Sequence, residues 1–94
     1  MEEVQKFQKE TDEIYKMFAV AMINEDHVLK ETAIKKLAES NKEMFHIENA
    51  RYFLLQLAEQ IEKNELLSAA TDQQYGIGVA GYVVRAIREH YGVI

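Results

Sequence analysis

The stretch ESNKEMFHIENARYFLLQLAEQ, residues 39–60, carries apolar side chains over an unusually wide part of a predicted helix. On a helical wheel of about 100° per residue, one broad arc holds most of them. A second patch, Phe45 and Tyr52, lies across a strip of acids. The arc and the patch together give more apolar surface than a helix needs for a single contact face. This helix therefore either lies in the middle of the fold or has its second patch covered by another chain. The arc comprises Ile47, Ala50, Phe53, Leu54, Leu57, Ala58 and Ile61, and the strip comprises Glu48, Glu59 and Glu62.

The start of this helix is marked by the pattern S-x-x-E, from Ser40 to Glu43. In this capping box, the serine and the glutamate side chains satisfy backbone N–H groups that the first turn leaves unpaired. The apolar residues Met44 and Phe45 follow directly. We therefore expect a third helix to begin here. One continuous helix over residues 25–63 is the alternative, and both possibilities remain open at this point.

The chain upstream reads as helical from its first residue, with apolar residues at alternating spacings of three and four. Thr11 is the one polar member of this row, and Tyr15, Met17 and Met22 widen it. The spacing predicts an amphipathic first helix whose apolar face packs on the rest of the fold. The row comprises Val4, Phe7, Thr11, Ile14, Phe18 and Ala21.

A pause in this pattern follows at INEDHVLKE, residues 23–31. Asn24 is a good N-cap residue, and the acids Glu25 and Asp26 suit the first turn of a helix, where the dipole favours negative charge. We expect a second helix from here to about Glu39. Its buried positions would be Val28 or Leu29, together with Ala33 and Leu37.

The last third of the chain has a second capping-box pattern, Thr71 to Gln74, after a predicted helical turn or two. A final helix follows and is expected to end at Gly92, in the left-handed C-cap position. Gly76, Gly78 and Gly81 mark either a close helix approach or a loop reaching residue 78, and both remain open. The apolar positions of this helix are Ala80, Val83, Val84, Ala86, Ile87 and Tyr91.

Composition limits the classes of function. The 94 residues suit one domain over residues 1–94, and the absence of proline and cysteine favours uninterrupted helices without disulfides or thiolate metal sites. The net charge of −5 argues against a nucleic-acid partner. No stretch is apolar enough to span a bilayer, and the acidic N-terminus is unlike a secretory signal, so no membrane partner and a cytoplasmic location are expected. We predict an all-α fold, a small antiparallel bundle of three to four helices that self-associates into a homo-oligomer.

A candidate metal site is formed by Glu43-x-x-His46, because residues three apart share a helix face. The spacing resembles half of the metal site in ferritin-like di-iron proteins. That resemblance implies a divalent metal such as iron, held between subunits, with Glu13 of the first helix as a further ligand. The competing explanation is structural: Glu43 belongs to the capping box, and His46 is a polar tip beside a packed stripe.

A candidate nuclease site is formed by Arg85 and His90, whose R-x4-H spacing resembles the signature of HEPN-type ribonucleases. The resemblance implies phosphodiester cleavage by an arginine and a histidine on one helix. The alternative is that Arg88 and Glu89 face solvent while His90 and Tyr91 close the helix, where the dipole favours cations.

The function that the sequence favours is non-enzymatic protein-protein interaction, as in a regulator, an immunity-type protein or an adaptor, with no cofactor. A partner protein or a second copy would cover the apolar excess. The expected contact residues are Phe45 and Tyr52 with the first-helix residues Phe7, Ile14 and Phe18. The acids Glu48, Glu59 and Glu62 are expected to steer a basic partner. The metal-binding oligomer that uses Glu13, Glu43 and His46 is the alternative.

Overall fold

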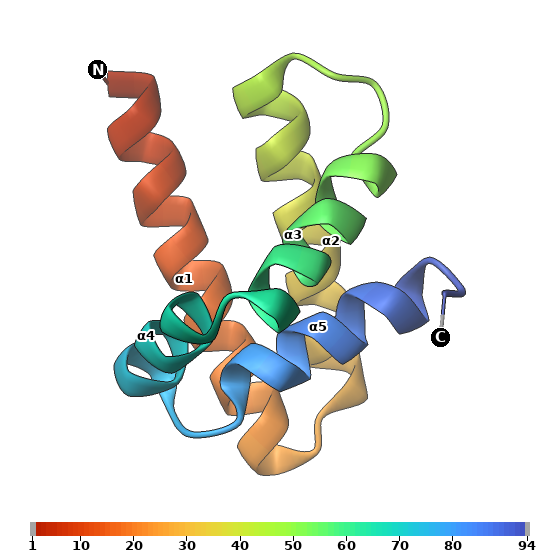
Figure 1. Ribbon diagram of the computed structural model, residues 1–94. Helices are drawn as coiled ribbons and strands as arrows, with labels where there is room; N and C mark the ends of the chain where they lie inside the picture. Colours follow the sequence, from red (N-terminus) through yellow and green to blue (C-terminus); the bar gives the residue numbers. More distant parts are fainter. Residues whose placement is uncertain (1, 94) are drawn as a thin grey trace.

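Five α-helices and no strand make up residues 2–93, the part of the chain that the computed structural model describes (Figure 1). The all-α class is therefore confirmed. The expected count of three to four helices was too low, because residues 65–75 form a full helix and not a turn or two. The helices are α1 (Glu2–Asn24), α2 (His27–Phe45), α3 (Arg51–Lys63), α4 (Glu65–Tyr75) and α5 (Val79–His90).

The turn between α1 and α2 is capped by Asp26 and not by Asn24, which is the last residue of α1. The Asp26 carboxylate accepts a hydrogen bond of 3.0 Å from the backbone N–H of Leu29. Glu25 adopts a left-handed conformation with φ of 52°, which reverses the chain before the cap. In α2, Val28 is exposed and Leu29 is half-buried, so the inward position is that of Leu29.

Asp26→Ala is expected to lower the free energy of unfolding by about 1 kcal/mol, because the alanine leaves the N–H of Leu29 without its acceptor. Urea denaturation followed by circular dichroism measures the loss. Asp26→Asn is the matched control, since asparagine caps as well as aspartate does. An equal loss in both variants would show that the cap does not contribute in this way.

Helix α2 runs through Ser40 and Glu43 without a break, so the expected helix start at Ser40 was wrong. The continuous helix over residues 25–63 was also wrong, because α2 ends at Phe45 and His46 caps it in the left-handed conformation. A capping serine must leave the helical conformation. Here Ser40 and Asn41 are buried within the length of α2. The side-chain amide of Asn41 donates to the Leu37 carbonyl at 2.8 Å.

Helix α3 begins after the irregular segment of residues 46–50, where the Asn49 side chain accepts from the backbone N–H of Arg51 at 2.9 Å. Asn64 then ends α3 and caps α4, accepting from the N–H of Leu67 at 3.1 Å. The capping box expected at Thr71 was wrong, since Thr71 lies inside α4 and donates to the Leu67 carbonyl. The N-terminus of α5 is satisfied from another helix, because the Asp72 carboxylate of α4 accepts from the N–H of Ala80 at 2.9 Å.

Of the two possibilities for the three glycines, loop or helix, each holds for some of them. Gly76 and Gly78 lie in the loop between α4 and α5 with positive φ, whereas Gly81 lies inside α5. Helix α5 ends at His90, and Gly92 takes the predicted left-handed conformation just after it, with φ of 70°. The N–H groups of Gly92 and Val93 bond to the carbonyls of Glu89 and Arg88, which is the Schellman pattern.

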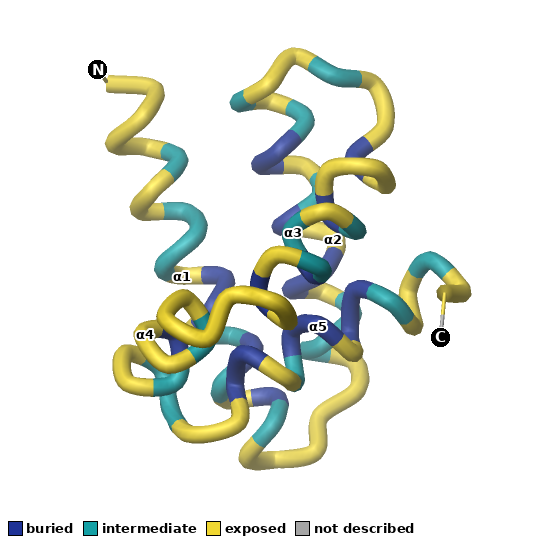
Figure 2. The backbone as a smooth tube through the Cα atoms, in the orientation of Figure 1, coloured by how far each residue is buried: buried dark blue, intermediate teal, exposed yellow. Residues whose placement is uncertain are grey.

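The core lies where α1, α2, α3 and α5 meet, and Figure 2 shows the buried residues gathered there. The helices that contact each other most extensively are α1 with α2 and α3 with α5. The N-terminal half of α1 and the last turn of α2 extend beyond this core, and their backbones diverge there (Figure 1). Across residues 2–93, no helix combines the length and apolarity that crossing a bilayer requires. The largest fully buried side chains are Phe18, Ile34, Leu37, Leu54, Ile61, Ile87, Val79 and Val83.

Helix α4 is tied to α1 by Tyr75, whose hydroxyl donates to the Asp12 carboxylate at 2.7 Å. The ring of Tyr75 lies 5.4 Å from that of the buried Tyr15. Burial raises the pKa of Tyr15 to about 12. Burial, together with the hydrogen bond to Asp12, raises the pKa of Tyr75 to about 12.

Stability is therefore expected to fall between pH 10 and about pH 12, starting from the ordinary tyrosine pKa of 10.0. Below this window both hydroxyls are protonated in the folded and unfolded chains, so their contribution is fully present. Within it the unfolded chain loses these protons first, which favours unfolding. Urea midpoints measured across the window report the fall. Tyr15→Phe removes one of the two groups and should make the fall shallower, whereas an unchanged slope would contradict the assignment.

Candidate functional site

Four aromatic rings from three segments form a continuous row on the surface. The Phe7 ring of α1 meets the Phe45 ring edge to face at 5.9 Å. Phe45 stacks on Phe53 at 5.3 Å with an interplanar angle of 11°. Tyr52 meets the Phe53 ring edge to face at 6.0 Å. We call Phe7, Phe45, Phe53 and Tyr52 the aromatic row.

The break between α2 and α3 creates this row. Phe45 is the last residue of α2, and Tyr52 and Phe53 lie in the first turn of α3. In one continuous helix, Phe45 and Phe53 would be eight residues apart, or roughly 12 Å along the axis, so their rings would not stack. The left-handed cap at His46 turns the chain and places the two rings in contact.

The aromatic row is open to solvent in the isolated chain. Phe45 is 46 % exposed, Phe53 is 39 % exposed and Tyr52 is 68 % exposed. Phe7 is half-buried, and Val4 extends the exposed apolar surface one turn along α1. The sequence had identified Phe7, Phe45 and Tyr52 as contact residues, but it had placed Phe53 on the buried arc of α3.

Two of the expected contact residues belong to the core and not to the surface. Ile14 is 4 % exposed and Phe18 is 0 % exposed. The ring of Phe18 meets that of Tyr82 of α5 at 6.4 Å, so α5 covers this part of α1. The expected surface along the first helix was therefore wrong beyond Phe7, since only the N-terminal end of α1 leaves the core.

The acidic strip of Glu48, Glu59 and Glu62 is not a single feature. Glu48 lies before α3, in the irregular segment. Glu59 pairs with Lys63 at 2.6 Å, and the Glu62 carboxylate binds the Arg88 guanidinium in a bidentate pair of 2.7 and 3.0 Å. These hydrogen bonds lower the pKa of both carboxyl groups. Two of the three acids are thus paired with cationic side chains of the same chain, which weakens their expected role in steering a basic partner.

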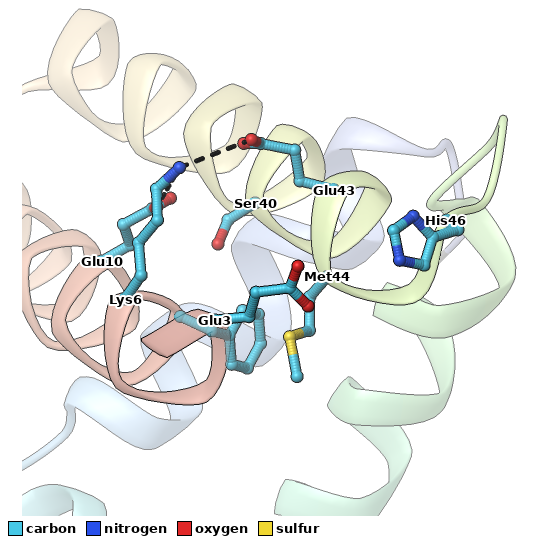
Figure 3. Close-up of a pocket in the computed structure, with 8 residues that line it drawn as sticks. Glu3, Lys6, Glu10, Ser40, Glu43, Met44 and His46 are labelled. Atoms are coloured by element: carbon cyan, nitrogen blue, oxygen red, sulfur yellow. Dashed lines mark ion pairs between the residues drawn. The ribbon is translucent and has the colours of Figure 1, made fainter. Parts of the chain in front are cut away.

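A groove of about 290 Å³ lies beside the aromatic row, between the diverging ends of α1 and α2 (Figure 3). Phe7 belongs to both the row and the groove. The Lys6 ammonium reaches across the groove, 3.5 Å from Glu43 of α2 and 3.8 Å from Glu10 of its own helix. The residues lining the groove are Glu3, Lys6, Phe7, Glu10, Ser40, Glu43, Met44 and His46.

Ser40 is the one buried polar side chain of residues 2–93 that lacks a hydrogen-bond partner. The residue is 4 % exposed, and its hydroxyl points from α2 into the space between the two helices (Figure 3). A buried hydroxyl without a partner costs stability, because it has given up its hydrogen bonds to water. The capping-box pattern had concealed this feature, since a capping serine is satisfied by its own helix.

Ser40→Ala is accordingly expected to raise the free energy of unfolding by about 1 kcal/mol, because it removes the unpaired hydroxyl and introduces a better helix former. Thermal and urea unfolding measure the change. Ser68→Ala is the contrasting control, since the Ser68 hydroxyl donates to the Ile61 carbonyl and its loss should destabilise the chain. A destabilised Ser40→Ala variant would mean that the hydroxyl has a partner in solution.

The metal-site residues are only partly brought together. Glu43 and His46 line the groove, but His46 caps α2 and does not lie on a helix face with Glu43. Glu13 does not line the groove, but it lines an adjoining pocket that shares Glu10, Ser40 and Glu43 with it. Within residues 2–93, no group of three His, Asp or Glu side chains is placed to hold a metal ion. The metal alternative therefore depends on ligands from a second subunit.

The candidate nuclease residues both lie on α5, but they do not line a common pocket. Arg85 lines two pockets, and His90 lines neither of them. The His90 ring nitrogen Nδ1 lies 3.2 Å from the Glu31 carboxylate of α2, and its ring packs against Tyr91. These contacts fix the end of α5 on α2, which the sequence did not predict. The structural alternative was wrong about Arg88, because its guanidinium pairs with Glu62 and does not simply face solvent.

Comparison of the chain with known protein families, with curated proteins and with solved structures returns no match. The function is therefore argued from the aromatic row and the adjoining groove.

Proposed function

We propose that this protein acts by binding another protein through the aromatic row. The supporting observation is the contact of four rings from α1, α2 and α3 on a surface that residues 2–93 leave partly exposed. Aromatic side chains are enriched at protein interfaces, where a few of them supply most of the binding energy. The proposal concerns recognition and requires no catalytic group.

The row differs from the other exposed apolar residues of the chain. Ile23, Leu66 and Ile77 are individually more exposed than Phe45, but they lie in α1, in α4 and in the loop before α5. Single exposed aliphatic residues are ordinary on a protein surface. Rings that contact one another lose little conformational freedom on binding, because packing already restricts their rotamers.

Self-association through the same row is the other form that this binding can take. The acidic groove beside the row disfavours it, since a two-fold contact would bring like charges together. A different protein, carrying basic groups, meets no such repulsion. We therefore propose a heterologous partner.

The test is capture of a partner from an extract of the cells that produce the protein, with the chain immobilised. We expect a stoichiometric partner that is retained by the native chain and by Leu66→Glu, but lost by Phe45→Glu. Leu66 is 84 % exposed on α4, away from the row, so its variant adds the same charge elsewhere. Circular dichroism verifies that both variants keep their helices. Equal retention by Phe45→Glu and Leu66→Glu would remove the aromatic row as the contact surface.

A further inference from the structure

The groove beside the aromatic row combines an acidic rim with an apolar floor. Its rim carries the carboxylates of Glu3, Glu10 and Glu43 against the single ammonium of Lys6. Lys6 is shared between Glu10 and Glu43, and the structure records no ion-pair partner for Glu3 among residues 2–93. The floor includes the side chains of Phe7 and Met44. Figure 3 shows Glu3, Lys6 and Glu10 of α1 on one side, facing Glu43 and Met44 of α2.

The unpaired Ser40 hydroxyl is a second and independent feature of the same groove. It offers an acceptor whose hydrogen-bonding capacity no group in residues 2–93 uses. The side chains of Lys6 and Met44 are long and unbranched, so they can rotate to admit a ligand to it. The carboxylates favour a group that donates hydrogen bonds and carries positive charge, Ser40 Oγ can accept one of those bonds, and the apolar side chains favour an apolar stem.

We infer that this groove receives the side chain of an arginine from the protein partner. The guanidinium would donate to Ser40 Oγ and to the carboxylates of Glu3 and Glu43, with its methylene stem against Phe7 and Met44. Apolar side chains of the same partner segment would then lie on the adjoining aromatic row. The inference rests on the proposed function and adds the chemistry of the segment that is bound.

Arginine fits the groove better than lysine, because its planar guanidinium presents five donors to several acceptors at once. A second copy of this chain is a poor source. Arg88 is already held by Glu62 in a bidentate pair. Arg51 and Arg85 are exposed, but a second copy would also bring its net charge of −5 towards the acidic rim.

The inference is tested with butylguanidinium, which reproduces the arginine side chain without a peptide. The full chain labelled with nitrogen-15 is titrated and followed by two-dimensional NMR. We expect saturable shifts confined to residues 3–10 and 40–46, with a dissociation constant on the order of 1–10 mM, as suits so small a ligand. Butylammonium should bind at least threefold more weakly, and butanol should give no saturable shift.

Variants identify the groups responsible. Glu43→Gln and Ser40→Ala are each expected to weaken butylguanidinium binding at least threefold. Glu65→Gln removes the same charge at the start of α4 and should leave the binding unchanged. The dispersion of the spectra shows directly that each variant is folded. Binding by Glu43→Gln or by Ser40→Ala that equals native binding would overturn the inference, and so would the absence of a saturable shift.

Failure here is distinguishable from failure of the proposed function. If butylguanidinium does not bind the groove while Phe45→Glu still loses a captured partner, the aromatic row stands and the arginine assignment falls. Light scattering on the same samples identifies the source of the arginine. A native dimer that butylguanidinium disperses would place the arginine on a second copy and overturn the assignment to a different protein.

Discussion

Phe18→Ala is expected to lower the free energy of unfolding by about 3–5 kcal/mol, the largest loss that we predict for a single substitution in this chain. The side chain is completely buried, and its ring packs between Tyr15 of its own helix and Tyr82 of α5. Alanine leaves a cavity between α1 and α5. Small domains are stable by only about 5–15 kcal/mol, so this loss is a large part of the total.

Urea denaturation followed by circular dichroism measures this loss, and thermal unfolding should show a midpoint lower by about 12 °C or more. Val20→Ala is the matched control on α1, because Val20 is 47 % exposed and outside the core, so its truncation should change stability by less than about 0.5 kcal/mol. If Phe18→Ala cost no more than Val20→Ala, α1 would not pack on α5 as described.

Gly76→Ala is expected to cost about 1–3 kcal/mol, because the backbone at this position has φ of 131° and ψ of 147°. That conformation is essentially restricted to glycine. The added Cβ would lie 3.6 Å from Val79 Cγ2, an ordinary contact distance. The loss would therefore come from backbone strain and not from a steric clash.

Gly81→Ala is expected to change the free energy of unfolding in the opposite direction from Gly76→Ala. Gly81 lies inside α5 without a positive φ, and the nearest atom to its added Cβ is the end of the flexible Arg85 side chain, at 3.4 Å. Alanine should therefore raise the free energy of unfolding by about 0.5–1 kcal/mol. Unfolding of both variants under one set of conditions measures the contrast. A destabilised Gly81→Ala with a neutral Gly76→Ala would mean that the loop and the start of α5 are placed wrongly.

Periodicity predicted the helical class and much of the core correctly. The inward positions Ala33, Leu37, Leu54, Ala58 and Ile61 are all buried, as their spacing indicated. Local patterns were less informative about helix ends. S-x-x-E occurs at Ser40 inside α2 as well as at true starts, because tertiary packing decides whether a serine leaves the helical conformation. The actual N-cap of α2, Asp26, lies two residues after Asn24, an equally good capping residue, and the N-cap of α4, Asn64, was not identified from the sequence.

The candidate site could be predicted only in part. The exposure of Phe45 and Tyr52 followed from their separation from the main apolar arc of residues 47–61. Their meeting with Phe7 and Phe53 did not, because it depends on the break at His46 and on how far α1 extends beyond the core. The helical wheel assumed a continuous helix, so it assigned Phe53 to the interior. The unpaired hydroxyl of Ser40 has no signature in sequence, since hydrogen bonding is decided by the surrounding packing.

The central claim is that the aromatic row is exposed on the isolated chain. Photochemically induced dynamic nuclear polarisation tests it most directly, because this NMR method detects tyrosine rings that a dye can reach. The purified chain should give a strong signal from Tyr52, assigned by its loss in Tyr52→Phe, and none from the buried Tyr15. A silent Tyr52 whose signal appears only in Phe45→Glu would contradict the account, because it would show that a second copy already covers the row.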